Sequence, residues 1–243
     1  MIPTTNQLIS YVITFAVYAV TMNWRVAIIL MVGVGFHECG HLWAAKKVGL
    51  KTSGFFLFPF VGGAAIINDT IRRYSQQSFM VMMGPIWGAV ISFAFYGMYL
   101  ITGLQVLGEA AQWMALINLF NLVPIFQIDG GQIMETITFS INEKLGVILM
   151  GISTVAGVIL VWPLNPIISV MIVIFGGPYL MAKYNNWKLR SQGQSYLATP
   201  LPKIMNKTQI FQTVGAYLVT AGALFFLYSV TSNGQLSYSN LFH

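Results

Sequence analysis

The chain has 243 residues, of which 56% are hydrophobic and only 7% are charged, and its mean hydropathy is +0.72. An ordinary soluble domain has roughly 25% charged residues, so this composition excludes that class and predicts a polytopic membrane protein. The net charge of +6 does not indicate nucleic-acid binding, because the basic residues are few and lie between apolar runs. Cys39 is the only cysteine, which excludes an internal disulfide.

Seven apolar runs are long enough to be membrane helices. We place them at residues 7–22, 24–45, 78–102, 109–140, 144–162, 165–183 and 208–230. The predicted fold is all-α, with about six or seven transmembrane helices in one integral membrane domain that spans residues 1–243. The residues before the first run contain no Lys or Arg, so we expect this run to remain as a helix rather than to be removed as a signal peptide.

The second run contains a His-Glu-x-x-His motif formed by His37, Glu38 and His41. On a helix the two histidines lie one turn apart on the same face, so both imidazoles can reach one metal ion. Glu38 is then placed to take a proton from a water molecule, as in zinc metalloproteases. The alternative is a structural histidine pair that faces the interior of a helix bundle. That reading has a physical cost, because three ionisable side chains would be desolvated together without a function.

Between the second and third runs, the sequence predicts a membrane-associated β-hairpin. Two short apolar segments, Phe55–Phe60 and Ala64–Ile67, flank Gly62 and Gly63. Both ends of this segment are expected on the same side of the membrane, so the hairpin would dip into the membrane and return. The alternative is a surface loop with a hydrophobic anchor.

Gly84 and Gly88 have the spacing G-x-x-x-G in the third run, which favours close helix packing over a direct role in a site.

In the fourth run, Asp129 is the candidate third metal ligand, since a catalytic zinc needs three protein ligands. We expect Pro124 and the pair Gly130-Gly131 to break the helix around Asp129 and to open backbone that lines a polar cavity. The amide of Asn121 can hold substrate backbone or an oxyanion. The alternatives are an N-terminal helix cap for Asp129 and a structural hydrogen bond for Asn121.

Two competing functions remain open on the residues alone. One is a metalloprotease whose third zinc ligand is a glutamate instead of Asp129. Glu135 and Glu143 are the downstream candidates for that ligand. A zinc-binding scaffold or transporter would not be an enzyme, although a transporter needs more polar residues along a pore than the six acids here provide.

Basic residues predict the orientation in the membrane, because Lys and Arg concentrate on the cytoplasmic side. If the second helix ends in the cytoplasm, only Arg25 lies outside. The cytoplasmic group is Lys46, Lys47, Lys51, Arg72, Arg73, Lys144, Lys183, Lys188, Arg190, Lys203 and Lys207. The N-terminus is then cytoplasmic, and the segment from Lys183 to Lys207 is expected to be a polar, basic cytoplasmic loop.

On these residues the chain resembles the site-2 protease family of intramembrane zinc metalloproteases. The match consists of the His-Glu-x-x-His motif and of Asn121-x-x-Pro124-x-x-x-x-Asp129-Gly130, and it covers about residues 24–140. Gly84-Pro85 is similar to a family Gly-Pro in the third helix, but the family's asparagine four residues after that glycine is Gly88 here. No PDZ or CBS domain is inserted, so the chain looks like a minimal member. Residues 1–23 and 141–243 would flank the catalytic core.

The resemblance implies one Zn²⁺ per chain and the roles of seven residues. These are zinc ligation by His37, His41 and Asp129, general-base catalysis by Glu38, substrate positioning by Asn121, and strand addition of the substrate at Gly62 and Gly63.

The resemblance also implies a zinc metalloendopeptidase of regulated intramembrane proteolysis in the cell membrane. Such an enzyme cleaves a membrane-anchored protein or a remnant signal peptide in or near its transmembrane segment, close to the cytoplasmic face. The partners are then this substrate and the lipid bilayer, with no nucleic acid. The alternative is a catalytically silent zinc-binding membrane scaffold, against which the intact Glu38 argues.

Overall fold

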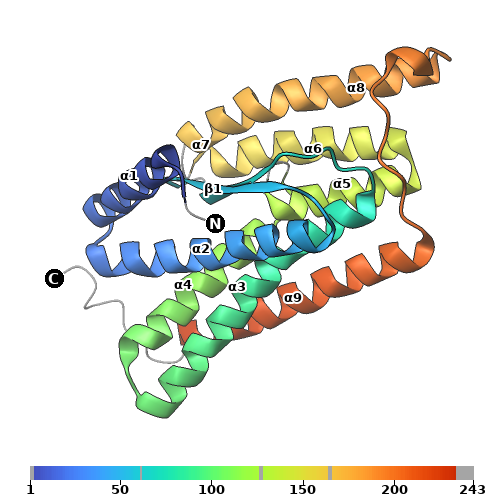
Figure 1. Cartoon of the computed structure of the whole chain (residues 1–243). Coiled ribbons are helices and arrows are strands. Elements are labelled where there is room, and N and C mark those ends of the chain that lie inside the picture. Colours follow the sequence, from blue (N-terminus) through green and yellow to red (C-terminus); the bar gives the residue numbers. More distant parts are fainter. Residues whose placement is uncertain (1–2, 61, 126–127, 164–165, 234–243) are drawn as a thin grey trace. The chain divides into compact units, whose positions relative to one another are not determined.

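The computed structural model describes residues 3–60, 62–125, 128–163 and 166–233, and this part of the chain is helical apart from one hairpin (Figure 1).

The chain divides into two compact units. The first contains the described residues up to Asp69, Met82–Asn121, and those from Ala216 onward; the second contains Thr70–Val81 and Leu122–Gly215. The helices and strands in chain order are α1 (Thr5–Thr21), α2 (Trp24–Lys47), β1 (Thr52–Phe58), β2 (Gly62–Ile67), α3 (Tyr74–Thr102), α4 (Gln105–Asn121), α5 (Asp129–Ile141), α6 (Glu143–Val161), α7 (Pro166–Met171), the π-helix η1 (Ile172–Gly176), α8 (Gly177–Ser191), the 3₁₀ turn η2 (Ser195–Leu197) and α9 (Lys207–Asn233).

The core of the first unit forms where α2 packs against α1 and α4. A tight turn joins α1 to α2, and the side chain of Asn23 caps α2 by accepting a hydrogen bond from the Val26 amide at 2.9 Å. Two clusters of buried residues fill the packed faces: Tyr18, Val26, Ala27 and Leu30, and Ile29, Ala110 and Met114.

The predicted hairpin between the second and third helices is confirmed. Strands β1 and β2 pair antiparallel, with Phe56 opposite Ala64 and Phe58 opposite Gly62. The glycine pair does not form the turn, contrary to the expectation, because Gly62 and Gly63 already belong to β2. The turn contains Pro59, whose fixed φ and missing N–H suit a turn and interrupt a strand.

Helix α1 packs against β1, and side chains from one face of the helix cover the outer edge of the strand. These side chains recur every three or four residues, so they point the same way. The hydrogen bonds run from Gln7 Nε2 to the Ser53 carbonyl (2.7 Å), from Tyr11 Oη to the Phe55 carbonyl (2.9 Å), from Thr14 Oγ1 to the Leu57 carbonyl (3.0 Å), from the Leu57 amide to Ser10 Oγ (3.2 Å) and from the Phe60 amide to Tyr18 Oη (3.1 Å). The edge of β1 therefore has its backbone groups paired without another strand.

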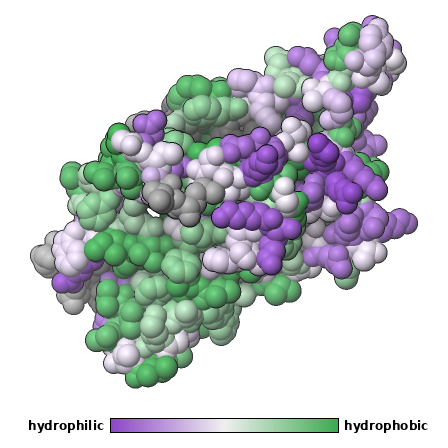
Figure 2. All heavy atoms as spheres, viewed as in Figure 1, coloured by the Kyte–Doolittle hydropathy of each residue, from purple (hydrophilic) through white to green (hydrophobic). Residues whose placement is uncertain are grey.

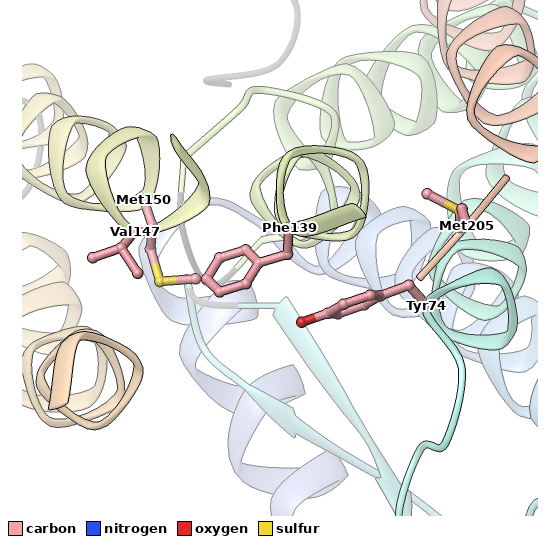
Figure 3. Packing of buried hydrophobic residues seen from close by; sticks show 5 residues of the cluster. All are labelled: Tyr74, Phe139, Val147, Met150 and Met205. Atoms are coloured by element: carbon pink, nitrogen blue, oxygen red, sulfur yellow. The ribbon is translucent and has the colours of Figure 1, made fainter. Parts of the chain in front are cut away.

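The second unit is built around an aromatic cluster at the start of α3 and on α5 and α6 (Figure 3). Tyr74 and Phe139 lie with their ring centroids 6.2 Å apart, and Val147, Met150 and Met205 complete the buried group.

The fourth predicted helix is two helices, because α4 ends at Asn121 and α5 begins at Asp129. A break near Asp129 was expected, but Gly130 and Gly131 lie inside α5 rather than at the break. Packing explains Gly130, since a Cβ there would overlap the backbone carbonyl groups of Leu122 and Val123. Residues 126 and 127 of the break lie outside the described residues.

The expectation of a polar loop from Lys183 to Lys207 is wrong for its first part, because α8 continues to Ser191. Two ion pairs hold this helix: Lys183 Nζ lies 2.8 Å from Glu135 Oε1, and Arg190 pairs with Glu143 at 2.5 Å. The periodicity of the sequence cannot reveal such ion pairs, because the partner carboxylates, Glu135 and Glu143, belong to other helices, α5 and α6.

Four helices of the described chain, α2, α3, α6 and α9, are long and apolar enough to cross a membrane. Figure 2 shows mainly apolar side chains over α1 to α3, and hydrophilic side chains around the end of α8 and the segment that leads to α9. The chain is thus a helical membrane protein with one hairpin, while the number of six or seven spans stays a prediction.

Replacement of Thr14 by valine is expected to destabilise the first unit by about 1–3 kcal/mol, because it leaves the buried Leu57 carbonyl without its donor at unchanged side-chain shape. Denaturation in mild detergent and amide exchange of the hairpin measure this change. Thr21→Val is the matched control, since the exposed Thr21 hydroxyl binds only the Val17 carbonyl of its own helix. Equal stability of the two variants would contradict a supporting role for α1.

Candidate metal centre

The two histidines of the motif form a buried pair on α2. His37 is 3% exposed and His41 is 7% exposed, and their Nε2 atoms lie 3.0 Å apart. The rings stand almost perpendicular, with an interplanar angle of 81°. Two imidazole nitrogens that converge in this way are suited to share one metal ion.

Gly84 lets the backbone of α3 pass directly beside this pair. A Cβ at Gly84 would lie 2.9 Å from His37 Nε2 and closer still to the His41 ring, nearer than real Cβ atoms approach. Gly84 serves close packing, as predicted, but its packing partner is the histidine pair, so this glycine also lies at the candidate site. The donor set suits a metal ion, because two convergent, buried imidazole nitrogens are usual zinc ligands.

Glu38 is also buried, and its carboxyl group lies against the backbone of Gly63. A Cβ at Gly63 would overlap Oε1 and Cδ of Glu38, so only glycine lets β2 pass this close. The carboxylate thus lies between the histidine-bearing helix and the hairpin, within the first unit.

Asn118, which the sequence reasoning did not select, supplies the amide beside the histidines. Its Oδ1 lies 2.8 Å from His37 Nδ1, its Nδ2 donates to the Met114 carbonyl at 2.7 Å, and its side chain is fully buried. Asn121, the predicted amide, is the last residue of α4. Asn118 could have been selected from the sequence because it is a polar amide within an apolar helix, about one turn before Asn121.

Asp129 lies in the second unit, where it is the first residue of α5 and is buried. A carboxylate in the first turn of a helix is favoured by the helix dipole. The preceding Ile128 occupies the N-cap position without a side-chain hydrogen bond, so Asp129 is not the cap that the alternative reading required.

The two rival carboxylates have other partners. Glu135 accepts hydrogen bonds from Tyr179 Oη at 3.0 and 3.3 Å besides its ion pair with Lys183. Glu143 is bound by the Arg190 guanidinium. Their geometry disfavours a metalloprotease that uses a downstream glutamate as its third ligand.

Comparison with known proteins agrees with this chemistry. The family model for "Peptidase family M50" matches residues 25–115. The chain is 32% identical over 129 residues to "Zinc metalloprotease MJ0392" of Methanocaldococcus jannaschii, an alignment that covers 51% of this chain and 36% of that protein. The chain therefore spans about a third of the length of this relative. The solved structure of "Site-2 Protease from Methanocaldococcus jannaschii" is similar in fold, with a TM-score of 0.52 and 20% identity over 83% of this chain and 93% of the other.

Gly84→Ala is expected to abolish metal binding, because the added methyl group enters the space beside both Nε2 atoms. Elemental analysis of the purified chain measures the bound metal. Gly97→Ala is the matched control on the same helix, since nothing lies within 4 Å of a Cβ there. Retention of metal by Gly84→Ala would mean that the ion does not bind between these nitrogens.

Proposed function

Because the chain carries a domain of peptidase family M50 over residues 25–115, we propose that it is an intramembrane zinc metalloprotease. The observation that carries this proposal is the buried pair of His37 and His41 nitrogens, 3.0 Å apart, against which the backbone of α3 packs at Gly84. Glu38 on the same helix adds the carboxylate that peptide hydrolysis requires.

We propose that His37, His41 and Asp129 hold one Zn²⁺ per chain. Two neutral imidazoles and a carboxylate are a usual ligand set for catalytic zinc, with one position left open. The ion pair of Glu135 with Lys183 supports Asp129 as the carboxylate ligand. Zinc, when bound, polarises the scissile carbonyl and lowers the pKa of water to about 7.

Glu38 acts as the general base, and then as the acid that passes the proton to the leaving nitrogen. Burial of this carboxylate beside the hairpin excludes bulk water and keeps it next to an extended backbone. Asn121 is proposed to hold the substrate backbone or the oxyanion, because an amide at the end of α4 has a donor to offer.

The substrate is expected to bind as an added strand, since a helical segment hides its peptide bonds and must unwind before cleavage. Unwinding in lipid leaves backbone groups unsatisfied at a cost of several kcal/mol each, and pairing with a strand restores their hydrogen bonds.

The edge of β2 suits this purpose better than that of β1. The backbone groups of Phe55 and Leu57 point to α1, so in an antiparallel ladder their partners Ala65 and Gly63 point away from β1 on the other edge. In the described part of the first unit, that outer edge of β2 has no backbone partner. Gly63 and Ala65, rather than Gly62, are therefore the proposed pairing residues.

Strand addition to β2 would bring the substrate to the general base, because Gly63 lies against the Glu38 carboxyl group. The edge of β1, which α1 already covers, would leave the substrate without this base. The same strand thus aligns the peptide and selects the bond to be cut.

Cleavage is proposed near the cytoplasmic face of the cell membrane. Lys46 and Lys47 occupy the last turn of α2, and Lys46 follows His41 by five positions, about 7.5 Å by helical rise. A cytoplasmic end for α2 follows from its basic last turn. The proposed substrates are membrane-anchored proteins or remnant signal peptides whose transmembrane segment enters from that side.

Asp129→Ala is expected to lose most of the bound zinc, whereas Glu38→Gln is expected to keep zinc and to lose cleavage by several orders of magnitude. Zinc per chain by elemental analysis, together with cleavage of a membrane-anchored reporter, separates the two roles.

Glu135→Ala is the control for the third ligand and should keep its zinc. Zinc that depends on Glu135 and not on Asp129 would overturn the proposed ligand set. Wild-type levels of reporter cleavage by Glu38→Gln would remove the proposed base, and no cleavage by the wild-type chain despite full zinc would favour the catalytically silent scaffold.

Ala65→Pro is expected to reduce reporter cleavage at least tenfold while zinc stays bound. Proline removes the outward N–H of β2 but spares the ladder to β1, because Ala65 forms a non-hydrogen-bonded pair with Phe55. Ala65→Val keeps this N–H and serves as the control for side-chain size. Unchanged cleavage by Ala65→Pro would rule out this edge as the substrate site.

A further inference from the structure

We propose that Asn118 is a positioning residue that fixes His37 as a metal ligand through Nε2. The proposal rests on the proposed function, because it assigns a role toward the same metal. Asn118 itself is separated from the space beside Gly84 by the His37 ring, since it contacts the opposite nitrogen, Nδ1. Its action on the metal is therefore indirect.

The orientation of the Asn118 amide follows from its second hydrogen bond. Nδ2 lies 2.7 Å from the Met114 carbonyl, which can only accept, so the NH₂ group must point there. The oxygen Oδ1 is then the atom that faces His37 Nδ1 at 2.8 Å. Met114 thus determines which end of the amide meets the histidine.

This orientation determines the tautomer of the histidine. Because Oδ1 has no hydrogen to donate, His37 Nδ1 must carry the proton and donate it. A neutral His37 then has its lone pair on Nε2, the atom that faces His41 Nε2. Outer hydrogen bonds of this kind orient metal-binding histidines and typically change metal affinity by 10- to 100-fold.

Gly88 makes room for this arrangement. A Cβ at Gly88 would overlap the carboxamide of Asn118, so α3 must lack a side chain where α4 inserts its amide. The two residues act as one unit: the glycine leaves a gap in α3, and the fully buried Asn118 fills it. This pairing also gives Gly88 a reason beyond general helix packing.

The first test is the tautomer of His37 in the metal-free full chain, by nitrogen NMR of histidine-labelled protein. The chain has only three histidines, so the signals can be assigned with single substitutions. We expect the Nδ1–H form in the wild type, a shift toward the other tautomer in Asn118→Ala, and retention of the Nδ1–H form in Asn118→Asp, which keeps an acceptor oxygen. The same tautomer in the wild type and in Asn118→Ala would overturn the proposal.

The second test is zinc affinity, measured by competition with a chelator. Asn118→Ala is expected to bind zinc 10- to 100-fold more weakly, and Asn118→Asp is expected to restore most of the affinity. Unchanged affinity in a folded Asn118→Ala chain would overturn the positioning role. If the wild type binds no zinc, the proposed function fails, and the tautomer alone decides the role of Asn118.

A double-mutant cycle with Gly88→Asn tests the shared space. In the wild-type background this substitution should weaken zinc binding strongly, because the new side chain displaces the Asn118 amide. In the Asn118→Ala background it should cost little, since the gap has been vacated. An equal loss in both backgrounds would show that the residues are independent and would contradict the proposed unit.

Discussion

The close approach of α3 to the histidine pair of α2 is the constraint on which the candidate centre depends. The two Nε2 atoms lie 3.0 Å apart, and α3 can pass beside them only because Gly84 has no side chain that would overlap the imidazoles. At Gly88 the same helix leaves room for the Asn118 amide, which contacts His37 at Nδ1, the ring nitrogen opposite Nε2. The same two glycines, Gly84 and Gly88, therefore allow α3 to pack on α2 and α4 and allow the candidate metal ligands to take their positions.

Buried polar groups explain the rest of the first unit. In an apolar setting each backbone N–H and C=O needs a partner, and an isolated hairpin leaves two edges unsatisfied. Helix α1 covers one edge with a polar face that includes Gln7, Tyr11 and Thr14. In the described part of this unit, the outer edge of β2 next to Glu38 has no backbone partner. A helix that the sequence treated as a flanking segment thus decides which edge of the hairpin is covered and which stays open.

Several features were predictable because they depend on neighbours in the sequence. The His-Glu-x-x-His spacing places both histidines on one helical face, and two short apolar segments around Gly62 and Gly63 indicate a hairpin. The turn position, the split of α4 from α5 and the continuation of α8 depend on partners that are distant along the chain, such as Glu143 for Arg190. Asn118 was overlooked for the same reason, since its partner lies 81 residues away.

The sequence by itself determined that this is a helical membrane protein with a histidine pair spaced to share a metal ion, a neighbouring carboxylate and a match to peptidase family M50 over residues 25–115, because composition, period and motif are local properties. The tertiary structure alone decided which amide orients His37, which glycines make room for the site and which strand edge stays open. Those outcomes depend on packing between segments, where a single Cβ decides whether two helices can approach, and no periodicity in the chain encodes that distance.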